Sequence, residues 1–233
     1  MVTSTVSIVA RCASTGQLGV ATVTAMLGVG KMVPHAAAGV GAVATQGMAN
    51  PYHGADGLRL MSEGLSAPQA LARVIRHDPG RDGRQTAMVD GRGGTAAWTG
   101  RGSMEWAGHA CRPGVTVQGN RLVGPEVLDA MLDAHERSGP GTALVLRLLR
   151  ALEAGEAAGA DREGALSAAL LVVHDEYYPL WDLRIDMADD PVVAIRELFE
   201  ESRERLLPHI LDLPKRADLM TGRVHAHGPT GGR

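Results

Sequence analysis

The stretches TVSIVAR, Thr5 to Arg11, and LGVATVTA, residues 18–25, decide how this chain folds. Both are rich in β-branched residues, which favour strands, and the CASTGQ segment between them offers Gly16 for a positive φ angle. The two stretches therefore predict an antiparallel β-hairpin. Its first strand has the pattern of a buried strand, yet it begins with a hydroxyl residue, and this placement raises the question of a chemical role for Thr5.

Length and composition limit the class of protein. With 233 residues, of which 45% are hydrophobic and 21% charged, the chain has the balance of a soluble globular domain with a sizeable core. A net charge of -3 argues against a nucleic-acid surface, which needs clustered Lys and Arg. The apolar runs are short and no basic leader precedes one, so we expect neither a membrane span nor a signal peptide. Two cysteines, Cys12 and Cys111, are too few for a disulfide framework, so we expect a reduced, cytoplasmic setting.

The rest of the chain arranges strands and helices in groups. Helices are expected at 55–63, 66–77, 124–137, 142–158 and 191–206, and further strands at 40–44, 84–90, 94–99, 114–120, 167–173 and 181–186. Because neighbouring strands read as hairpins, the order predicts an α+β fold in which two antiparallel sheets stack face to face with helices outside. We expect residues 1–206 to form a single domain and residues 207–233, which are aperiodic, to form a loosely ordered tail.

Several familiar motifs are missing. The glycines of GVGAVATQG do not match a phosphate-binding loop, and neither a G-x-S-x-G elbow nor an H-E-x-x-H zinc motif occurs. The HAH stretch at 225–227 stands alone in the predicted tail. Asp186, Asp189 and Asp190 lack the calcium-loop pattern and are interpreted as a turn and an N-cap ahead of Pro191. We therefore expect no metal and no other cofactor.

A set of polar side chains stands at strand ends, where strand and loop meet. Its uncharged amides are suited to donating to an oxyanion or holding a substrate amide without adding charge. The alternative interpretation is that each member caps a strand or a turn, and periodicity alone does not show that they converge. The set consists of Thr5, Ser7, Thr45, Gln46, Asn50, Arg84, Gln85, Gln118, Asn120 and Asp161.

Taken in order, the motifs resemble one bacterial family. They are TVSIVAR, TGQLGVA, AGVGAVATQ, ANPYHG, RQ, WAGH, QGN and GADREGALSAALLV. Over roughly residues 5–200 the chain is similar to the domain of unknown function 1028 family, which is assigned to the N-terminal-nucleophile hydrolase superfamily. The resemblance implies a four-layer αββα sandwich, in agreement with the fold expected from the strand and helix pattern.

The resemblance also implies a chemistry. In N-terminal-nucleophile enzymes the hydroxyl or thiol of the first residue attacks an amide carbonyl, and the α-amine of the same residue takes the proton. An α-amine has a pKa of about 7.7–8.0, so a useful fraction is neutral at pH 7. The implied nucleophile is Thr5, and Ser7 shares its sheet face. The expected activity is hydrolysis of a small non-peptide amide bond.

The other members of the set receive roles from the same resemblance. Gln118 or Asn120 is the implied oxyanion donor, and Arg84 or Arg11 is implied to hold a substrate carboxylate. The remaining polar residues at the strand ends are expected to contact the small-molecule substrate; they are Thr45, Gln46, Asn50, Gln85 and Asp161.

Departures from the family pattern leave other functions open. Residues 1–4 precede Thr5, so a free α-amine requires cleavage between Ser4 and Thr5. Ala25 stands where relatives often carry a basic residue, and Glu163, Ala165 and Leu166 replace two basic residues and a Gln. One alternative is a catalytically inactive scaffold that binds a small molecule or serves in assembly. Another is chemistry by the hydroxyl of Ser7 or Thr5 with an external base, for which His109 is the first candidate.

The Ala- and Leu-rich helices expected at 124–137 and 142–158 bear on self-association. They either pair across a two-fold axis, which makes a homodimer, or pack on the sheet of their own chain.

Overall fold

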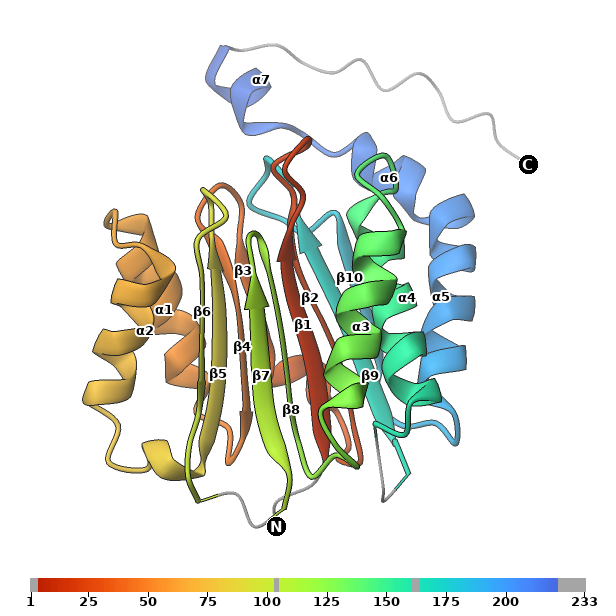
Figure 1. The fold of residues 1–233 in the computed structure, drawn as a ribbon. Helices are drawn as coiled ribbons and strands as arrows, with labels where there is room; N and C mark the ends of the chain where they lie inside the picture. The colour runs from red at the N-terminus through yellow and green to blue at the C-terminus, as the bar shows by residue number, and fades with distance from the viewer. Residues whose placement is uncertain (1–3, 103–104, 161–163, 222–233) are drawn as a thin grey trace.

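The computed structural model describes residues 4–102, 105–160 and 164–221 and contains two antiparallel sheets with helices packed against them (Figure 1). Asp161, Glu163 and the HAH stretch at 225–227 lie outside the described residues. Among the described residues, no helix combines the length and the apolar character needed to cross a lipid bilayer.

Sheet A has six strands in the order β10-β9-β2-β1-β8-β7. Its strands are β1 (Thr5–Arg11), β2 (Leu18–Thr24), β7 (Ala107–Arg112), β8 (Val115–Asn120), β9 (Ser167–Val173) and β10 (Trp181–Ile185). The predicted hairpin is confirmed, because β1 pairs antiparallel with β2 and sets Thr5 opposite Thr24. On its other side β1 pairs with β8, which sets Thr5 opposite Asn120. The head of β1 therefore lies in the middle of the sheet, with a polar residue on each side.

Sheet B has four strands in the order β3-β4-β5-β6. Its strands are β3 (Pro34–Ala37), β4 (Gly41–Gly47), β5 (Arg84–Asp90) and β6 (Thr95–Thr99). Sheet B faces sheet A, with β4 and β5 packed over β1, β2 and β8. The space between the sheets is filled at one end by aliphatic side chains, among them Val9, Leu18, Val20, Ala42, Ala44, Ala87 and Val89.

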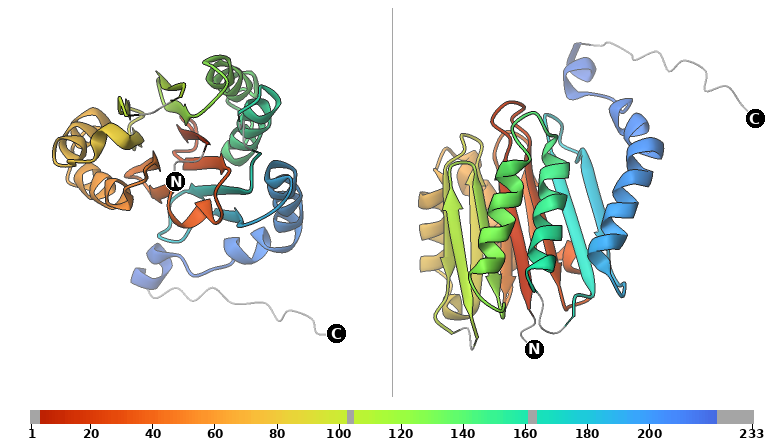
Figure 2. Two further views of the ribbon diagram at one scale, coloured as in Figure 1. Left: turned by 90° about the horizontal axis from the view of Figure 1, so that it is seen from below. Right: turned by 45° about the vertical axis from the view of Figure 1, so that its right-hand side comes forward.

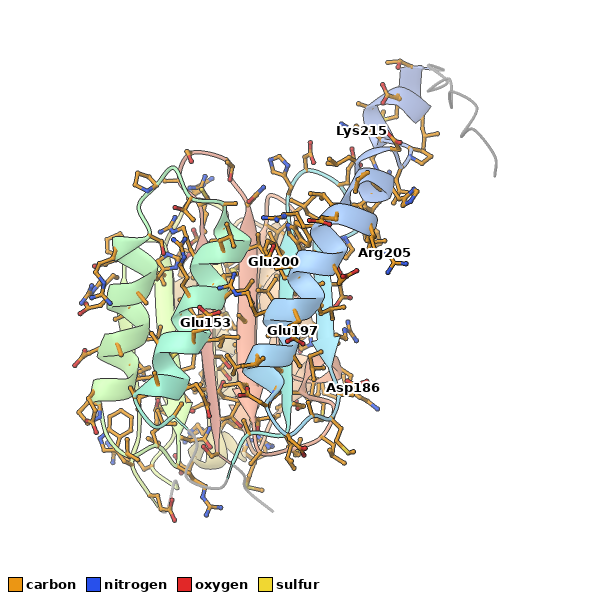
Figure 3. All side chains as sticks on the ribbon, turned by 90° about the vertical axis from the view of Figure 1, so that its right-hand side faces the viewer. Glu153, Asp186, Glu197, Glu200, Arg205 and Lys215 are labelled. Atoms are coloured by element: carbon orange, nitrogen blue, oxygen red, sulfur yellow. The ribbon has the colours of Figure 1, made fainter. Side chains whose placement is uncertain are left out.

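Helices cover the outer face of each sheet (Figure 2). Sheet B carries α1 (Pro51–Ser62) and α2 (Ala67–Arg76), and sheet A carries α3 (Glu126–Arg137), α4 (Leu144–Ala157) and α5 (Pro191–Arg205). The apolar faces of α3 and α4 are buried against sheet A within the same chain. Glu153, Glu197 and Glu200 lie on the outer side of α4 and α5 (Figure 3). A homodimer stays a prediction.

Local signals explain where several helices start. Ser66 forms a capping box with Gln69 at the start of α2, as its position before a Pro-containing first turn predicts. Asp190 caps α5 by accepting a hydrogen bond from the Val193 N–H at 3.0 Å, which confirms the turn and N-cap interpretation. These caps satisfy N–H groups that have no partner inside the helix.

The structure adds elements that the pattern did not predict. Strand β3 is four residues long and β7 is an edge strand of mixed polarity, so neither shows a clear alternation. Helix α1 starts at Pro51, several residues earlier than expected, because Asn50 caps it and Pro51 suits a first turn. Within the region expected to be a loosely ordered tail, α6 (Leu207–Leu211) and α7 (Arg216–Thr221) are short helices without buried residues.

Candidate functional site

Alternation along β1 directs its polar side chains into the space between the sheets. Val6 and Ile8 belong to the core under α3 and α4, whereas Val9 belongs to the core between the sheets. Thr5 and Ser7 share the parity of Val9, so they face sheet B. Both are buried, with Thr5 6% exposed and Ser7 fully covered. Strand β1 thus places the hydroxyls of Thr5 and Ser7 between the two sheets, at the end where the aliphatic side chains stop.

The Thr5 hydroxyl contacts a second threonine. Its Oγ1 lies 3.0 Å from Oγ1 of Thr24, on the neighbouring strand β2. Thr24 donates its own hydroxyl hydrogen to the Ser4 carbonyl oxygen at 2.7 Å. Because a hydroxyl carries only one hydrogen, the hydrogen between the two threonines belongs to Thr5. The three groups form a chain of hydrogen bonds from Thr5 through Thr24 to Ser4.

Gln46 links the two sheets beneath these hydroxyls. It comes from β4 of sheet B, and its Oε1 accepts a hydrogen bond from Ser7. Its Nε2 donates to the Thr5 carbonyl oxygen at 3.2 Å and to Oε1 of Gln85 at 2.9 Å. Gln46 is 1% exposed and keeps both ends of its amide paired, which a buried polar group requires.

Gln85 and Asn120 continue the network. Gln85 Oε1 accepts from Asn120 Nδ2 at 3.0 Å, and Gln85 Nε2 donates to the carbonyls of Gly108 and Gly119 at 3.0 and 2.7 Å. We call Gln46, Gln85, Gln118 and Asn120 the amide layer.

Two atoms of the amide layer have no hydrogen-bond partner among the described residues. They are Nε2 of Gln118, a donor, and Oδ1 of Asn120, an acceptor. Both residues are at least 98% buried, with exposures of 0% and 2%. An unpaired buried polar atom costs about 1–3 kcal/mol, so native structures keep few of them without a reason. Each of these two atoms therefore has a hydrogen-bonding position that no described residue fills.

A pocket opens beside Asn120. It has a volume of about 130 Å³ and is bordered by Gln85, Thr99 and Asn120, by the charged side chains of Arg84 and Arg121, and by loop glycines. A cavity of roughly 150 Å³ holds a benzene molecule, so this pocket accepts a group of similar size. Arg121 has a positive φ of 58°, an uncommon conformation for a residue other than glycine, at the point where β8 ends and the pocket begins.

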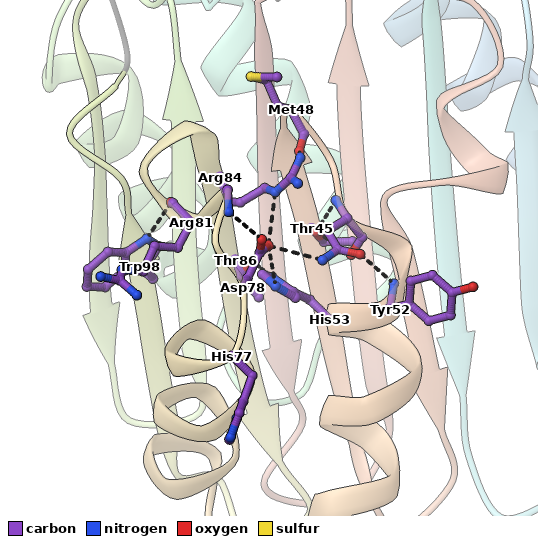
Figure 4. Close-up of polar contacts among 12 residues, drawn as sticks. Thr45, Met48, Tyr52, His53, His77, Asp78, Arg81, Arg84, Thr86 and Trp98 are labelled. Carbon is purple, nitrogen blue, oxygen red and sulfur yellow. Dashed lines mark hydrogen bonds and ion pairs between the residues drawn. The ribbon is translucent and has the colours of Figure 1, made fainter.

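A second polar cluster lies on the outer face of sheet B, around Asp78 (Figure 4). Asp78 Oδ2 accepts from Asn50 Nδ2 and from Arg84 Nε, each at 3.0 Å, and lies 2.9 Å from Nε2 of His53. Burial alone would raise the pKa of Asp78, but the hydrogen bonds from Asn50, the Gly80 N–H and Arg84 lower it to about 2. Burial lowers the pKa of His53 despite the nearby carboxylate. We call Asn50, His53, Asp78 and Arg84 the Asp78 cluster.

The structure separates residues that the sequence analysis grouped together. Thr45 follows Ala44 on β4 and so faces away from sheet A, where its hydroxyl donates to the Asn50 carbonyl at 3.1 Å. Asn50 caps α1. Arg84 reaches the pocket from the Asp78 cluster, where the carboxylate holds its guanidinium. Thr45 and Asn50 therefore do not join the amide layer.

Arg11 lies far from Thr5. It ends the seven-residue strand β1 that Thr5 begins, and at ~3.3 Å per residue the two are roughly 20 Å apart. Arg11 pairs with Leu18 at the hairpin end of the sheet, so it does not join the candidate site.

Sequence reasoning missed the contributions of Thr24, Thr99, His53 and Asp78. The alternation Thr22, Val23, Thr24 was a usable signal, because it puts both hydroxyls on one face of β2. His53 and Asp78 gave no such signal, since a lone His and a lone Asp occur in many turns and helices. Their pairing comes from a fold that brings the start of α1 against the end of α2.

Comparisons with known proteins identify the family of the chain. The sequence model described as "Family of unknown function (DUF1028)" matches residues 5–195. No curated protein gives a significant match. Among solved structures, protein SPO2555 from Silicibacter pomeroyi, described with the same family, is 32% identical with a TM-score of 0.88 over 99% of both chains. Anbu (ancestral beta-subunit) from Yersinia bercovieri is 12% identical with a TM-score of 0.41, over 90% of this chain and 98% of that one.

Proposed function

The chain belongs to the DUF1028 family of unknown function, and from this premise we propose that it is an N-terminal-nucleophile amidohydrolase that uses Thr5 to cleave a small non-peptide amide. One observation carries the proposal: the Thr5 hydroxyl lies buried at the head of a central strand, between Thr24 and Asn120 and beside the amide layer. We also propose that the arrangement is the four-layer αββα sandwich of this superfamily. The packing of α1 and α2 on sheet B, and of α3 to α5 on sheet A, supports it.

The chemistry requires cleavage of the Ser4–Thr5 peptide bond. While Ser4 is attached, the Thr5 nitrogen is an amide without a basic lone pair. After cleavage, Thr5 Oγ attacks the substrate carbonyl carbon and its proton passes to the α-amine. The C–N bond then breaks, and the α-amine returns the proton to the leaving amine. Water attacks the resulting ester, releases the carboxylic acid and restores the Thr5 hydroxyl.

The amide layer supplies uncharged contacts for the substrate. Asn120 Oδ1 lacks a donor and Asn120 borders the pocket, so it can accept a hydrogen bond from the nitrogen of the reacting amide. Gln118 Nε2 offers a donor two residues earlier on the same face of β8. Neutral groups hold a neutral amide without the cost of burying an unpaired charge. The pocket has room for a leaving amine of about the size of one six-membered ring.

Mass spectrometry and turnover test the proposal together. The intact mass of purified protein is expected to lack residues 1–4, and the chain that begins with Thr5 is expected to hydrolyse small amides. Thr5→Ala should abolish turnover, since the nucleophile is lost, while Thr5→Ser should keep part of it. Thr15→Ala, in an exposed turn, is the matched control and should behave as the natural chain.

A full-length mass that does not change on storage, or Thr5→Ala protein that still turns over substrate, contradicts the proposal. A chain made to begin with Thr5 that cleaves none of a broad panel of amides contradicts it as well.

A second candidate function is binding of a small molecule without catalysis. Ser4 is 1% exposed and its carbonyl is held by two hydrogen bonds, which shields the peptide bond that must be cut. Under this alternative the chain stays full-length, and a ligand raises the melting temperature without forming product.

Chemistry with His109 as an external base has less support. His109 Nδ1 lies 2.8 Å from the hydroxyl of Thr99, and no hydrogen bond joins His109 to Thr5 or Ser7 among the described residues.

A further inference from the structure

Ser4 occupies a buried place of its own beside the nucleophile. Its hydroxyl donates to the Ala160 carbonyl oxygen at 3.2 Å. Its own carbonyl oxygen accepts from the Thr24 hydroxyl at 2.7 Å and from the Ala25 N–H at 3.2 Å. These contacts of the Ser4 hydroxyl and carbonyl are made with groups from other parts of the chain. We call the space that Ser4 fills the Ser4 subsite.

Cleavage between Ser4 and Thr5 would empty this subsite. The Thr24 hydroxyl, the Ala25 N–H and the Ala160 carbonyl would then each lose the partner that Ser4 provides. Thr24 and Ala160 are each 1% exposed while Ser4 is in place, so Ser4 now supplies hydrogen bonds that buried polar groups require. A ligand that offers one acceptor and one donor in the places of the Ser4 carbonyl and hydroxyl would be favoured.

The subsite lies where the acyl part of an amide must go. When Thr5 Oγ attacks an amide, the acyl group becomes bonded to Oγ, and its carbonyl oxygen must lie close to that atom. Thr24 Oγ1 is 3.0 Å from Thr5 Oγ1 and 2.7 Å from the Ser4 carbonyl oxygen, so one hydroxyl reaches both. The pocket at Asn120 is on the opposite side of Thr5, because Thr24 and Asn120 pair with Thr5 from different strands.

We propose that the Ser4 subsite binds the acyl part of the substrate and selects a short 3-hydroxyacyl group, of the size and shape of a seryl residue. This inference rests on the proposed function. The substrate carbonyl oxygen accepts from Thr24 and Ala25, and the 3-hydroxyl donates to the Ala160 carbonyl, as the Ser4 hydroxyl does. The amine part lies in the pocket beside Asn120.

Thr24 is then a catalytic residue. When Thr5 Oγ bonds to the carbonyl carbon, the electron pair of the C=O bond moves to the oxygen, where the Thr24 hydroxyl and the Ala25 N–H stabilise the charge. The C–N bond breaks as the electron pair on the oxygen forms the C=O bond again. The proton reaches the leaving amine through the Thr5 α-amine. This places at Thr24 and Ala25 the oxyanion contact that the family resemblance suggested for Gln118 or Asn120.

Two matched anilides test the acyl preference on the chain that begins with Thr5, checked for native folding by circular dichroism. The anilides of 3-hydroxypropanoic and butanoic acid share a shape and differ by a hydroxyl in place of a methyl group. We expect kcat/KM to be at least about tenfold higher for the hydroxy compound, because only it pairs the Ala160 carbonyl. The readout is released aniline.

Variants of β2 test the carbonyl contact. Thr24→Val is expected to lower kcat about 100-fold with a small change in KM, and Thr24→Ser is expected to restore most of it. Thr22→Val is the matched control, because Thr22 is equally buried and donates to the Val6 carbonyl at 3.1 Å instead. The Thr22→Val variant should still cleave the 3-hydroxypropanoic anilide with a higher kcat/KM than the butanoic anilide.

The outcomes separate the two proposals. Equal cleavage of both anilides, preference for the butanoyl compound, or full activity of Thr24→Val overturns the acyl assignment and leaves amide hydrolysis standing. If neither anilide is cleaved, calorimetric titration of 3-hydroxypropanamide and butanamide decides. Tighter binding of the hydroxy amide supports the subsite, and equal or undetectable binding overturns it.

Discussion

At the scale of single residues, the candidate site is built from uncharged amides where many enzymes bury charged groups. Each side-chain amide offers both donors and acceptors, so Gln46, Gln85 and Asn120 pair with one another and with backbone carbonyls. Gln85 is the centre of the layer, because it contacts Gln46, Asn120 and two backbone carbonyls at once. Of the two atoms left unpaired, Oδ1 of Asn120 belongs to a residue that borders the pocket.

Replacing Gln85 tests how much the amide layer contributes to stability. Gln85→Leu keeps the volume but leaves donors on Gln46 and Asn120 without their acceptor. We expect the free energy of unfolding to fall by about 2–4 kcal/mol, measured by denaturant titration. Gln69→Leu, on the exposed start of α2, should cost no more than about 1 kcal/mol. Equal losses for the two variants would contradict a special role of the layer.

At the scale of elements, α1 shows how the chain packs a helix close to a sheet. Gly54 and Gly57 lie on its buried face, where the absence of a side chain lets His35 and Met88 approach the helix backbone. The N-terminal end of α1 is held by Asn50 and His53, which contact Asp78 beyond the end of α2. Small residues and one carboxylate thus set the position of α1 against sheet B.

Gly54→Ala tests this close packing, because the substitution should destabilise the protein where alanine in a helix normally stabilises it. Alanine normally stabilises a helix relative to glycine by about 1 kcal/mol. At Gly54, however, a Cβ would lie 2.3–2.5 Å from the His35 ring, so the ring or the helix must shift. We expect a net loss of about 1–3 kcal/mol in thermal or chemical unfolding. Gly141→Ala, in a turn where a Cβ meets nothing within 4 Å, is the control for adding a methyl group without a clash. An equal loss of stability at both positions would contradict the prediction.

At the scale of the whole molecule, buried histidines make the fold sensitive to acid. His135 on α3 is 2% exposed, and Arg147 approaches its Nε2 at 2.6 Å, which requires a neutral ring that accepts. Burial and the Arg147 charge lower the pKa of His135 to about 3. Burial also lowers the pKa of His35 and of His53. In the unfolded chain these rings titrate near their ordinary pKa of about 6.5.

The pH dependence of stability follows from these shifts. Well above about pH 6.5 the rings are neutral in both the folded and the unfolded state, and their contribution to stability is complete. As the pH falls from 6.5 towards 3, the unfolded chain binds a proton that folded His135 does not take up, so the free energy of unfolding drops by about 1.4 kcal/mol per pH unit for this ring. His35 and His53 shift stability in the same direction, because their pKa values are also lowered. Denaturant titrations between pH 7 and 5 should show this slope, and His135→Gln should reduce it.

Ser138→Ala serves as the control for this prediction. It removes a nearby hydrogen bond from Ser138 to the Ala134 carbonyl, but no titrating group. Stability should fall by a similar amount at every pH. A slope that His135→Gln leaves unchanged would show that this ring is not responsible for the acid sensitivity.

The sequence by itself determined most of the local elements and the sheet face of several strand residues. The hairpin of β1 and β2, the caps of α2 and α5, and the shared face of Thr5 and Ser7 follow from turn residues, capping residues and a period of two. The ten polar residues grouped at predicted strand ends included all four members of the amide layer.

Only the tertiary structure decided which of these residues meet. A strand period fixes the face of a side chain but not the sheet or the strand that lies opposite, which depends on the pairing of segments far apart in the chain. The tertiary structure placed Arg11, Thr45 and Asn50 away from the amide layer, and it joined Ser4 to Ala160 across 156 positions. Contacts of that range are set by the packing of whole sheets and helices, because no local pattern encodes them.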